Sequence, residues 1–424
     1  MKFFLTGIKG SGMSALAIVL KDLGNDVKGS DYESYIFTQD ELDKHNIAVN
    51  DFSIDNIDDI ELLIVGHNFI DSENIEILEA KRRGIEIIEY HKFISEFIKN
   101  YYSIAVSGSN GKSTTTALIS LILNEVENTS FLVGSGEGRG NKSKYFTFEA
   151  CEYKEHFLEY KPNLILVNNI DYDHVDYYKS EDDYKSAFYK FIENAKDKVV
   201  VNGDDINLKY IKNTIVFGIY NRTMFNARNI SYENGIKYDL YYKDEYIDKI
   251  EIEMYGECMV YNTLASICVC MSLGISIEII KRGLKKFKGV KRRFMETIID
   301  DDVYIDDYAH HPSKIRAIID AVKSKYKDRK VIAFFRPDRI SRLDYFSSSF
   351  LASLKRADEF YVLPFISNTK EENESYFKFI NDHNLEKIND DVYSRVSKQR
   401  GVVYLMMSSK SMEEVKENLL KYKG

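Results

Sequence analysis

Three times along this chain, a short apolar β-like run ends at glycines or acidic residues and passes directly into a helix-like segment. The β-like runs cover residues 2–7, 102–108 and 303–308, and the third is followed by a helix-like segment and a further strand at 330–335. Alternation of this kind predicts parallel sheets with crossover helices. Because 424 residues exceed what one ordinary core can organise, we predict three α/β domains with parallel-rich sheets. The predicted domains are residues 1–98, 99–293 and 294–424.

Composition narrows the functional classes. Hydrophobic residues make up 44% of the chain and aromatic residues 13%, enough for several cores. A net charge of −9 argues against a general nucleic-acid or anionic-membrane binder, which needs a positive field. No apolar run reaches the roughly 18 residues of a membrane-spanning helix, and no leader-like segment begins the sequence. We therefore expect a cytoplasmic protein without nucleic-acid partners or membrane insertion, either a monomer or a homodimer.

The four cysteines show no paired spacing typical of a metal site. Cys268 and Cys270 lie in an apolar helix-like run, so we predict that both are buried and structural. This pattern fits a reducing compartment.

The second β-like run, residues 102–108, leads into a shortened phosphate-binding loop at 108–114, which has two residues between its glycines. Glycines let backbone N–H groups approach phosphate oxygens, and the following helix N-terminus adds positive potential. Lys112 can reach the β- and γ-phosphates, while the hydroxyl of Ser113 or Thr114 can bind Mg²⁺. Because strand, loop and helix follow in the required order, we predict nucleotide binding. Hydrolases, kinases and ligases share such a loop, so it does not name the reaction.

Two polar positions follow the next strand-like runs of this domain. Glu149 closes the run 145–149, and His174 follows the run 164–170. Alone, each would be a solvated acid or a loop hydrogen-bonder. Behind a phosphate-binding loop, a carboxylate and an imidazole at neighbouring strand ends are predicted to bind a metal ion on the transferred phosphate.

A second glycine loop, Gly7-Ile8-Lys9-Gly10-Ser11-Gly12, follows the first strand, and Asp31 follows the next strand-like run. The arrangement is similar to a dinucleotide fingerprint, but its spacing is G-x-x-G-x-G instead of G-x-G-x-x-G. We therefore favour a phosphate or nucleotide-sugar site over an NAD site. A purely structural tight turn is the third interpretation.

The C-terminal third holds another polar constellation. Residues 306–312, Asp-Asp-Tyr-Ala-His-His-Pro, end a strand-like run before a helix predicted from about Pro312. Arg339 and Arg342 follow the next strand and would share one face if their segment is helical. Two guanidiniums there could bind a carboxylate, whereas the alternative is a solvated basic turn.

Taken together, these segments resemble the Mur ligase family of peptidoglycan synthesis along essentially the whole chain. The resemblance rests on GIKGSGMSALA from Gly7, GSDYESYIFTQ from Gly29, GSNGKSTTT from Gly108, FEACEYKEHFLEYKP from Phe148, NNIDYDHVDYY from Asn168, GVKRRF from Gly289 and DDYAHHP from Asp306. It is closest to members that join L-alanine to UDP-N-acetylmuramate. The resemblance implies a UDP-substrate domain, a central ATPase domain and a C-terminal amino-acid domain.

The resemblance also implies the chemistry and the residues. ATP would phosphorylate the muramoyl carboxylate, and the amine of an amino acid would displace phosphate from the acyl phosphate. The implied catalytic residues are Lys112, Glu149 and His174, and the implied Mg²⁺ ligands are Ser113, Thr114, Glu149 and His174. The implied ATP-binding residues are Gly108, Asn110, Gly111, Lys112, Ser113, Thr114, Asn262 and Arg293. The implied UDP-substrate residues are Gly7, Gly10, Ser11, Gly12, Met13, Ser14 and Asp31. The implied amino-acid residues are Tyr308, His310, Arg339 and Arg342.

Several positions depart from the family pattern. The phosphate-binding loop has Asn110 where the family usually has a His. In the family motif expected beside the adenine, this chain keeps Asn262, but Cys258 and Met259 replace the usual His and Asn. Lys314 stands where an acid is usual, residues 336–338 read Arg-Pro-Asp for Gln-Pro-His, and 408–411 read Ser-Ser-Lys-Ser for Gly-Ala-Gly-Asp. These changes leave open an amine other than L-alanine, such as glycine or serine, and a catalytically weak paralogue that binds nucleotide-sugar. A plain NAD dehydrogenase would leave the phosphate-binding loop unexplained.

Overall fold

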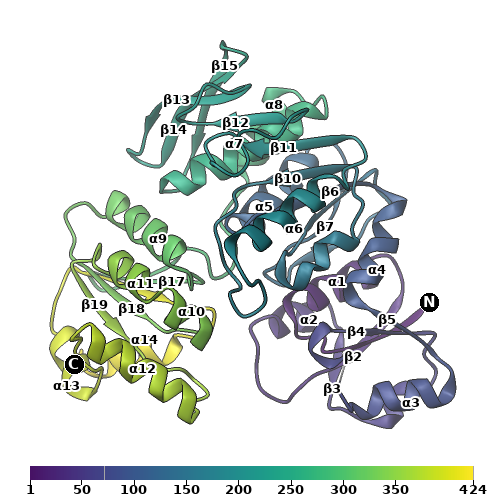
Figure 1. Ribbon diagram of the computed structural model, residues 1–424, viewed down its shortest axis with the longest axis horizontal. Helices are drawn as coiled ribbons and strands as arrows, with labels where there is room; N and C mark the ends of the chain where they lie inside the picture. Colours follow the sequence, from purple (N-terminus) through teal and green to yellow (C-terminus); the bar gives the residue numbers. More distant parts are fainter. Residues whose placement is uncertain (71, 424) are drawn as a thin grey trace.

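The computed structural model, which describes residues 1–70 and 72–423, contains three separate β-sheets in chain order, each with its own helices (Figure 1). The predicted three-part, parallel-rich α/β architecture is confirmed. The boundaries at 98/99 and 293/294 stay predictions.

The N-terminal sheet is fully parallel with strand order β3-β2-β1-β4-β5. Its strands are β1 (Lys2–Thr6), β2 (Asp26–Ser30), β3 (Ala48–Asn50), β4 (Leu62–Val65) and β5 (Glu86–Glu89). The helices of this part are α1 (Ser11–Asp22), α2 (Gln39–Lys44), α3 (Ile75–Arg83) and α4 (Tyr90–Phe97). The strand order reverses direction between β1 and β4, which is where open α/β sheets bind ligands. The glycine loop after β1 lies at this point.

The central sheet has ten strands in the order β15-β14-β13-β12-β11-β10-β6-β9-β7-β8. Its strands are β6 (Tyr102–Ser107), β7 (Ser130–Leu132), β8 (Gly138–Arg139), β9 (Tyr145–Glu149), β10 (Leu164–Val167), β11 (Lys198–Asn202), β12 (Ile215–Gly218), β13 (Phe225–Ser231), β14 (Ile236–Tyr242) and β15 (Glu245–Ile252). The helices are α5 (Lys112–Leu123), α6 (Glu181–Ile192), α7 (Glu257–Ser272) and α8 (Ile277–Lys285). Strands β6, β9 and β10 are parallel neighbours, so their carboxyl ends meet at one edge. That edge carries the phosphate-binding loop, Glu149 and the segment leading to His174.

The C-terminal sheet has the order β16-β17-β20-β18-β19, and only the β16–β17 pair is antiparallel. Its strands are β16 (Met295–Ile299), β17 (Asp302–Asp307), β18 (Val331–Phe335), β19 (Glu359–Val362) and β20 (Val403–Met407). The helices are α9 (Pro312–Lys325), α10 (Ile340–Tyr345), α11 (Ser347–Leu354), α12 (Lys370–Asp382), α13 (Asp390–Val396) and α14 (Glu413–Lys421). Helix α9 begins at Pro312, as the sequence predicts.

Apolar side chains fill the space between each sheet and its helices. Helix α5 packs under the central sheet through Leu118, Ile119 and Ile122, all fully buried. Cys268 and Cys270 on α7 are completely buried in the same cluster, which confirms their predicted place. No helix in the described residues is both long and apolar enough to cross a membrane.

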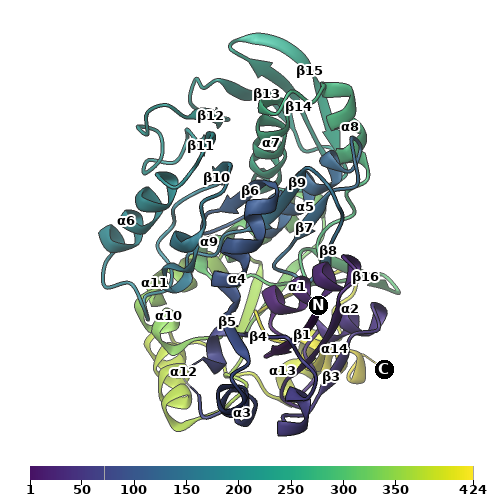
Figure 2. The same ribbon diagram turned by 90° about the vertical axis from the view of Figure 1, so that its right-hand side faces the viewer.

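The two views show how the three parts meet. The C-terminal part lies beside the other two in Figure 1, with α9 on the side that faces the central part. Turning the molecule places α1 and α4 of the N-terminal part directly below the central sheet (Figure 2). Helix α1 contacts β7 and β8, so the first glycine loop begins next to the central sheet.

Candidate active site

The phosphate-binding loop joins β6 to α5 in a narrow turn. Gly108 and Gly111 have φ angles of +127° and +83°, which only glycine adopts without strain. A Cβ on Gly111 would lie 2.4 Å from Oδ1 of Asn262, which also accepts a hydrogen bond from the Thr115 hydroxyl at 3.2 Å. Asn262, predicted to face the nucleotide, therefore packs against the loop from α7. Ser113 and Thr114 lie in the first turn of α5 with partly exposed side chains.

Lys112 projects back over the loop and makes two contacts. Its Nζ donates to the carbonyl of Gly108 at 2.5 Å and to Oε2 of Glu152 at 2.8 Å. Burial raises the pKa of Glu152, but the charges of Lys112 and His174 outweigh it and lower the pKa to about 2. The carboxylate is therefore ionised and neutralises the lysine. Sequence reasoning missed Glu152, although it lies in the quoted FEACEY segment, three residues after Glu149.

Glu149 and His174, predicted as metal ligands, both lie beside Lys112 and Glu152. Glu149 ends β9 and accepts a hydrogen bond from the Gly134 N–H. Burial raises its pKa, opposed by Gly134, Lys112 and Ser113. His174 has a left-handed φ of 56°, and its Nε2 lies 3.5 Å from Oε1 of Glu152.

The donor set at this point fits phosphates and a hard divalent ion. Within the described residues, Nδ1 of His174 and Oδ1 of Asn110 are buried without a hydrogen-bond partner. No three His, Cys, Asp or Glu side chains of that part of the chain converge as a metal-binding group. Mg²⁺ commonly takes only one or two carboxylates and completes its shell with water and phosphate oxygens. Metal binding by Ser113, Thr114, Glu149 and His174 stays a prediction.

The N-terminal glycine loop turns tightly at Gly7, whose φ is +84°. Gly10 caps the N-terminus of α1, and Ser11 and Gly12, which begin the helix, are both partly exposed. Met13 and Ser14 are buried, and the Ser14 hydroxyl donates to the carbonyl of Gly136 at 3.3 Å. The first turn of α1 therefore touches the central part, and the UDP role of the loop stays a prediction.

Asp31 holds this loop together instead of projecting from it. Its Oδ2 accepts the backbone N–H of Lys9 at 2.7 Å, and its Oδ1 accepts that of Tyr32 at 2.8 Å. In a dinucleotide site the corresponding acid binds the ribose hydroxyls. Both oxygens of Asp31 accept backbone protons of the loop, so this acid braces the loop, and its role toward the UDP-substrate stays a prediction.

Arg339 and Arg342 do not form one helical face, because Arg339 precedes α10 in an extended conformation. Both guanidiniums reach a loop of the central part. Nε of Arg342 donates to Oδ1 of Asp173 at 2.9 Å, its Nη1 donates to Asp338 at 2.6 Å, and Arg339 pairs with Asp176 at 2.5 Å. The amino-acid role of these arginines stays a prediction. In the structure, both arginines link the C-terminal part to the central part.

Tyr308 and His310 lie after β17 with Arg293 beside them. The Arg293 guanidinium lies 4.9 Å from the Tyr308 ring centre, and the Tyr308 and His310 rings meet edge to face at 5.1 Å. Burial and then the charge of Lys314 hold the pKa of His310 well below its usual value, so its imidazole is neutral.

The C-terminal constellation meets the phosphate-binding loop directly. Nδ2 of Asn110 lies 3.3 Å from the Ser313 hydroxyl, and Nε2 of His311 lies 3.1 Å from the carbonyl of Tyr172. Residues about 200 positions apart in the chain thus meet at one junction. The predicted phosphate, metal and amino-acid residues are brought together at this junction.

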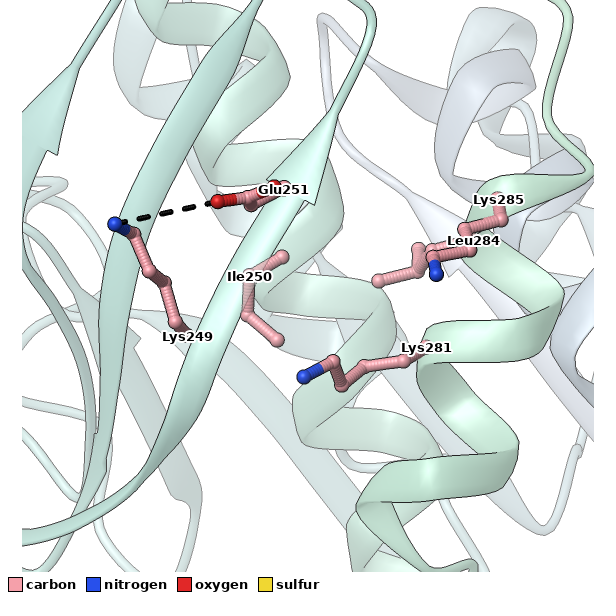
Figure 3. A pocket seen from close by; sticks show the side chains of 6 residues that line it. All are labelled: Lys249, Ile250, Glu251, Lys281, Leu284 and Lys285. Atoms are coloured by element: carbon pink, nitrogen blue, oxygen red, sulfur yellow. Dashed lines mark ion pairs between the residues drawn. The ribbon is translucent and has the colours of Figure 1, made fainter.

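A shallow pocket elsewhere is not part of this junction. It lies between β15 and α8 and is lined by Lys249, Ile250, Glu251, Lys281, Leu284 and Lys285 (Figure 3). None of these residues belongs to the two glycine loops or to the C-terminal constellation.

Family models match three successive parts of the chain. The model of the Mur ligase family, catalytic domain, matches residues 4–102, and that of the Mur ligase middle domain matches residues 106–270. The model of the Mur ligase, glutamate ligase domain, matches residues 292–408.

Solved structures give the same picture over the full length. The chain is 25% identical to UDP-N-acetylmuramate-alanine ligase MurC from Thermotoga maritima, covering 100% of this chain and 98% of that one with a TM-score of 0.82. It is 22% identical to murein peptide ligase Mpl from Psychrobacter arcticus, covering 100% and 99% with a TM-score of 0.73. MurF ligase from Thermotoga maritima, solved in complex with ADP, is 17% identical over 94% of each chain with a TM-score of 0.62.

Proposed function

Because this chain belongs to the Mur ligase family of ATP-dependent, amide-bond-forming ligases of peptidoglycan precursor synthesis, we propose that it joins L-alanine to UDP-N-acetylmuramate. The single observation that carries the proposal is the contact between Asn110 of the phosphate-binding loop and Ser313 of the C-terminal constellation. An acyl phosphate must form at the nucleotide and be attacked by an amine held nearby. A junction at which both parts meet provides that proximity.

The protein's own residues divide this work. Lys112 and the amides of the phosphate-binding loop hold the phosphates, and Glu149, His174 and the Ser113 and Thr114 hydroxyls hold Mg²⁺. The metal supplies charge neutralisation at the transferred phosphate when bound. Glu152 keeps Lys112 over the loop until the phosphates replace it as the partner of the ammonium. The first glycine loop, braced by Asp31, holds the UDP-sugar at the end of β1.

L-alanine is favoured because the MurC structure gives a higher identity and TM-score than the Mpl structure. A different amino acid is a second candidate. It is supported by the charged side chains Lys314 and Asp338, which both act on the buried imidazole of His310.

The test is phosphate release from ATP and Mg²⁺ in the presence of UDP-N-acetylmuramate, across a panel of amino acids, with mass analysis of the product. Release that depends on L-alanine together with the amide mass supports the proposal. Release with glycine, serine or another amine replaces L-alanine but keeps the ligase. No release with any amine, despite measurable binding of UDP-N-acetylmuramate, identifies a non-catalytic paralogue and refutes the proposal.

A further inference from the structure

The first turn of α9 lies against the phosphate-binding loop. The Ser313 hydroxyl that contacts Asn110 also lies 2.9 Å from Nδ1 of His311, which fixes the start of the helix on the loop. Helix α9 has 14 residues and begins with a proline, so its N-terminal amides and its dipole present positive potential here. Lys314 is the next residue, in the same turn.

Lys314 has an imidazole as its partner and no carboxylate. Its Nζ lies 3.5 Å from Nε2 of His310. Because Nδ1 of His310 donates to the carbonyl of Tyr308 at 2.8 Å, Nε2 is the unprotonated nitrogen and accepts from the lysine. The sequence departure at 314 thus places an ammonium group at the junction.

Other cations of the junction are already paired. Lys112 pairs with Glu152, Arg339 with Asp176, and Arg342 with two aspartates. In the part of the chain that the structure describes, Lys314 contacts His310 and Arg293 contacts Tyr308, and neither has a carboxylate within the 4.0 Å of an ion pair.

Among the charged groups that act most on the pKa of Lys314, three are cations and one is an anion. Burial lowers the pKa of Lys314 to about 8, and the charges of Lys112, Arg293 and Arg342 add to this effect while Asp173 opposes it. An anion placed among these groups would be stabilised by each of them. Lys314, Arg293 and the N-terminus of α9 therefore offer positive charge beside the phosphate-binding loop.

We propose that Lys314, with Arg293 and the N-terminus of α9, binds the phosphoryl group that leaves the nucleotide, first as the acyl phosphate and then as inorganic phosphate. The inference rests on the proposed ligase function for the identity of the anion. When the neutral amine attacks, a carbon–nitrogen bond forms, phosphate leaves with the electron pair of the carbon–oxygen bond, and the proton that the amine loses passes to the leaving phosphate. Lys314 stays protonated throughout and neutralises the charge that phosphate carries away.

The competing assignment is the carboxylate of the incoming amino acid. Phosphate is favoured because Lys112 is among the charges that act on Lys314 and because the preceding residue contacts the phosphate-binding loop itself. A tetrahedral dianion can use several separate point charges, which suits a lysine; a carboxylate is best matched by a planar guanidinium.

The test titrates inorganic phosphate into the full-length protein saturated with ADP and Mg²⁺, and measures the dissociation constant by calorimetry. Lys314→Gln is expected to weaken phosphate binding at least ten-fold, and Lys314→Arg, which keeps the charge, is expected to restore most of it. Lys325→Gln, on the last turn of the same helix and paired with Glu296, is the matched control and should bind as wild type. Circular dichroism verifies that each variant is folded.

Wild-type affinity in Lys314→Gln would overturn the proposal, as would a wild-type protein that binds no phosphate. A raised KM for the amino acid with unchanged phosphate affinity would overturn it in favour of the carboxylate assignment. Because phosphate binding is measured without turnover, failure here is separate from failure of the ligase assay.

Discussion

Replacing Arg342 with alanine is expected to loosen the attachment of the C-terminal part to the central part. Arg342 is 3% exposed and its partner Asp173 is 5% exposed, so the substitution leaves a buried carboxylate without its cation. Removing one member of a buried ion pair costs about 3–5 kcal/mol. Burial raises the pKa of Asp173, but Arg342 and neighbouring cations hold it well below its usual range.

The assay is urea unfolding, read at the first transition because a chain with three cores is not expected to unfold in one step. With a slope of about 3 kcal/mol per molar urea, the upper end of the usual range because the slope grows with chain size, the loss should move that midpoint down by about 1–2 M. Since the folded pKa of Asp173 is depressed, its stabilising contribution is present above its unfolded pKa and is lost as pH falls through the acidic range. The difference between wild type and variant should therefore shrink at acidic pH.

Arg356→Ala is the control, because Arg356 pairs with Asp320 on the surface and both are about half exposed. Exposed pairs contribute about 0–1 kcal/mol, so its midpoint should move little. A shift for Arg342→Ala no larger than that of the control would refute the reasoning that the Arg342–Asp173 pair fastens the two parts together.

Two further substitutions and one pH titration test the chemistry. Lys112→Ala should abolish phosphate release while circular dichroism stays unchanged, and wild-type turnover would contradict its role at the phosphates. Glu149→Gln should raise the Mg²⁺ concentration for half-maximal phosphate release about ten-fold, the scale typical of a lost ligand or its support, and an unchanged Mg²⁺ requirement would remove it from the metal site. Phosphate affinity should fall about ten-fold from pH 7 to pH 9 as Lys314, whose pKa is about 8, loses its proton, whereas Lys314→Arg should show a weaker dependence in the same titration.

The sequence predicts the strands and the phosphate-binding loop because their signals are local. Buried parallel strands read as apolar runs, and the glycines of 108–111 sit between such a run and a helix. The contact between Asn110 and Ser313 spans 203 positions, and no local pattern encodes it. For the same reason Glu152 was not singled out: its role depends on Lys112, which reaches it across the loop.

Side-chain pairing was the least predictable property. The spacing of Arg339 and Arg342 predicts a basic turn. Whether these arginines bind a ligand or a protein carboxylate depends on the loop that carries Asp173 and Asp176, 160 or more residues away in the chain. Asp31 shows the same limit, because its spacing fits a ribose ligand while backbone amides of its own loop occupy both oxygens.

The two arginines can be separated by experiment because their pairs differ in burial. The Arg339–Asp176 pair is partly exposed, with 36% and 28% of the two side chains accessible, so it is worth little in water and can be exchanged for a substrate carboxylate. Arg342 is buried and pairs with two aspartates, so if it bound a substrate carboxylate instead, both aspartates would lose their cation. Arg339→Ala should therefore raise the KM for the amino acid at least ten-fold, leave the KM for ATP within about two-fold, and change the urea midpoint little. Arg339→Ala could instead lower the urea midpoint as Arg342→Ala does and leave the amino-acid KM unchanged. In that case both arginines attach the C-terminal part to the central part, and other residues of the junction must bind the carboxylate of the amino acid.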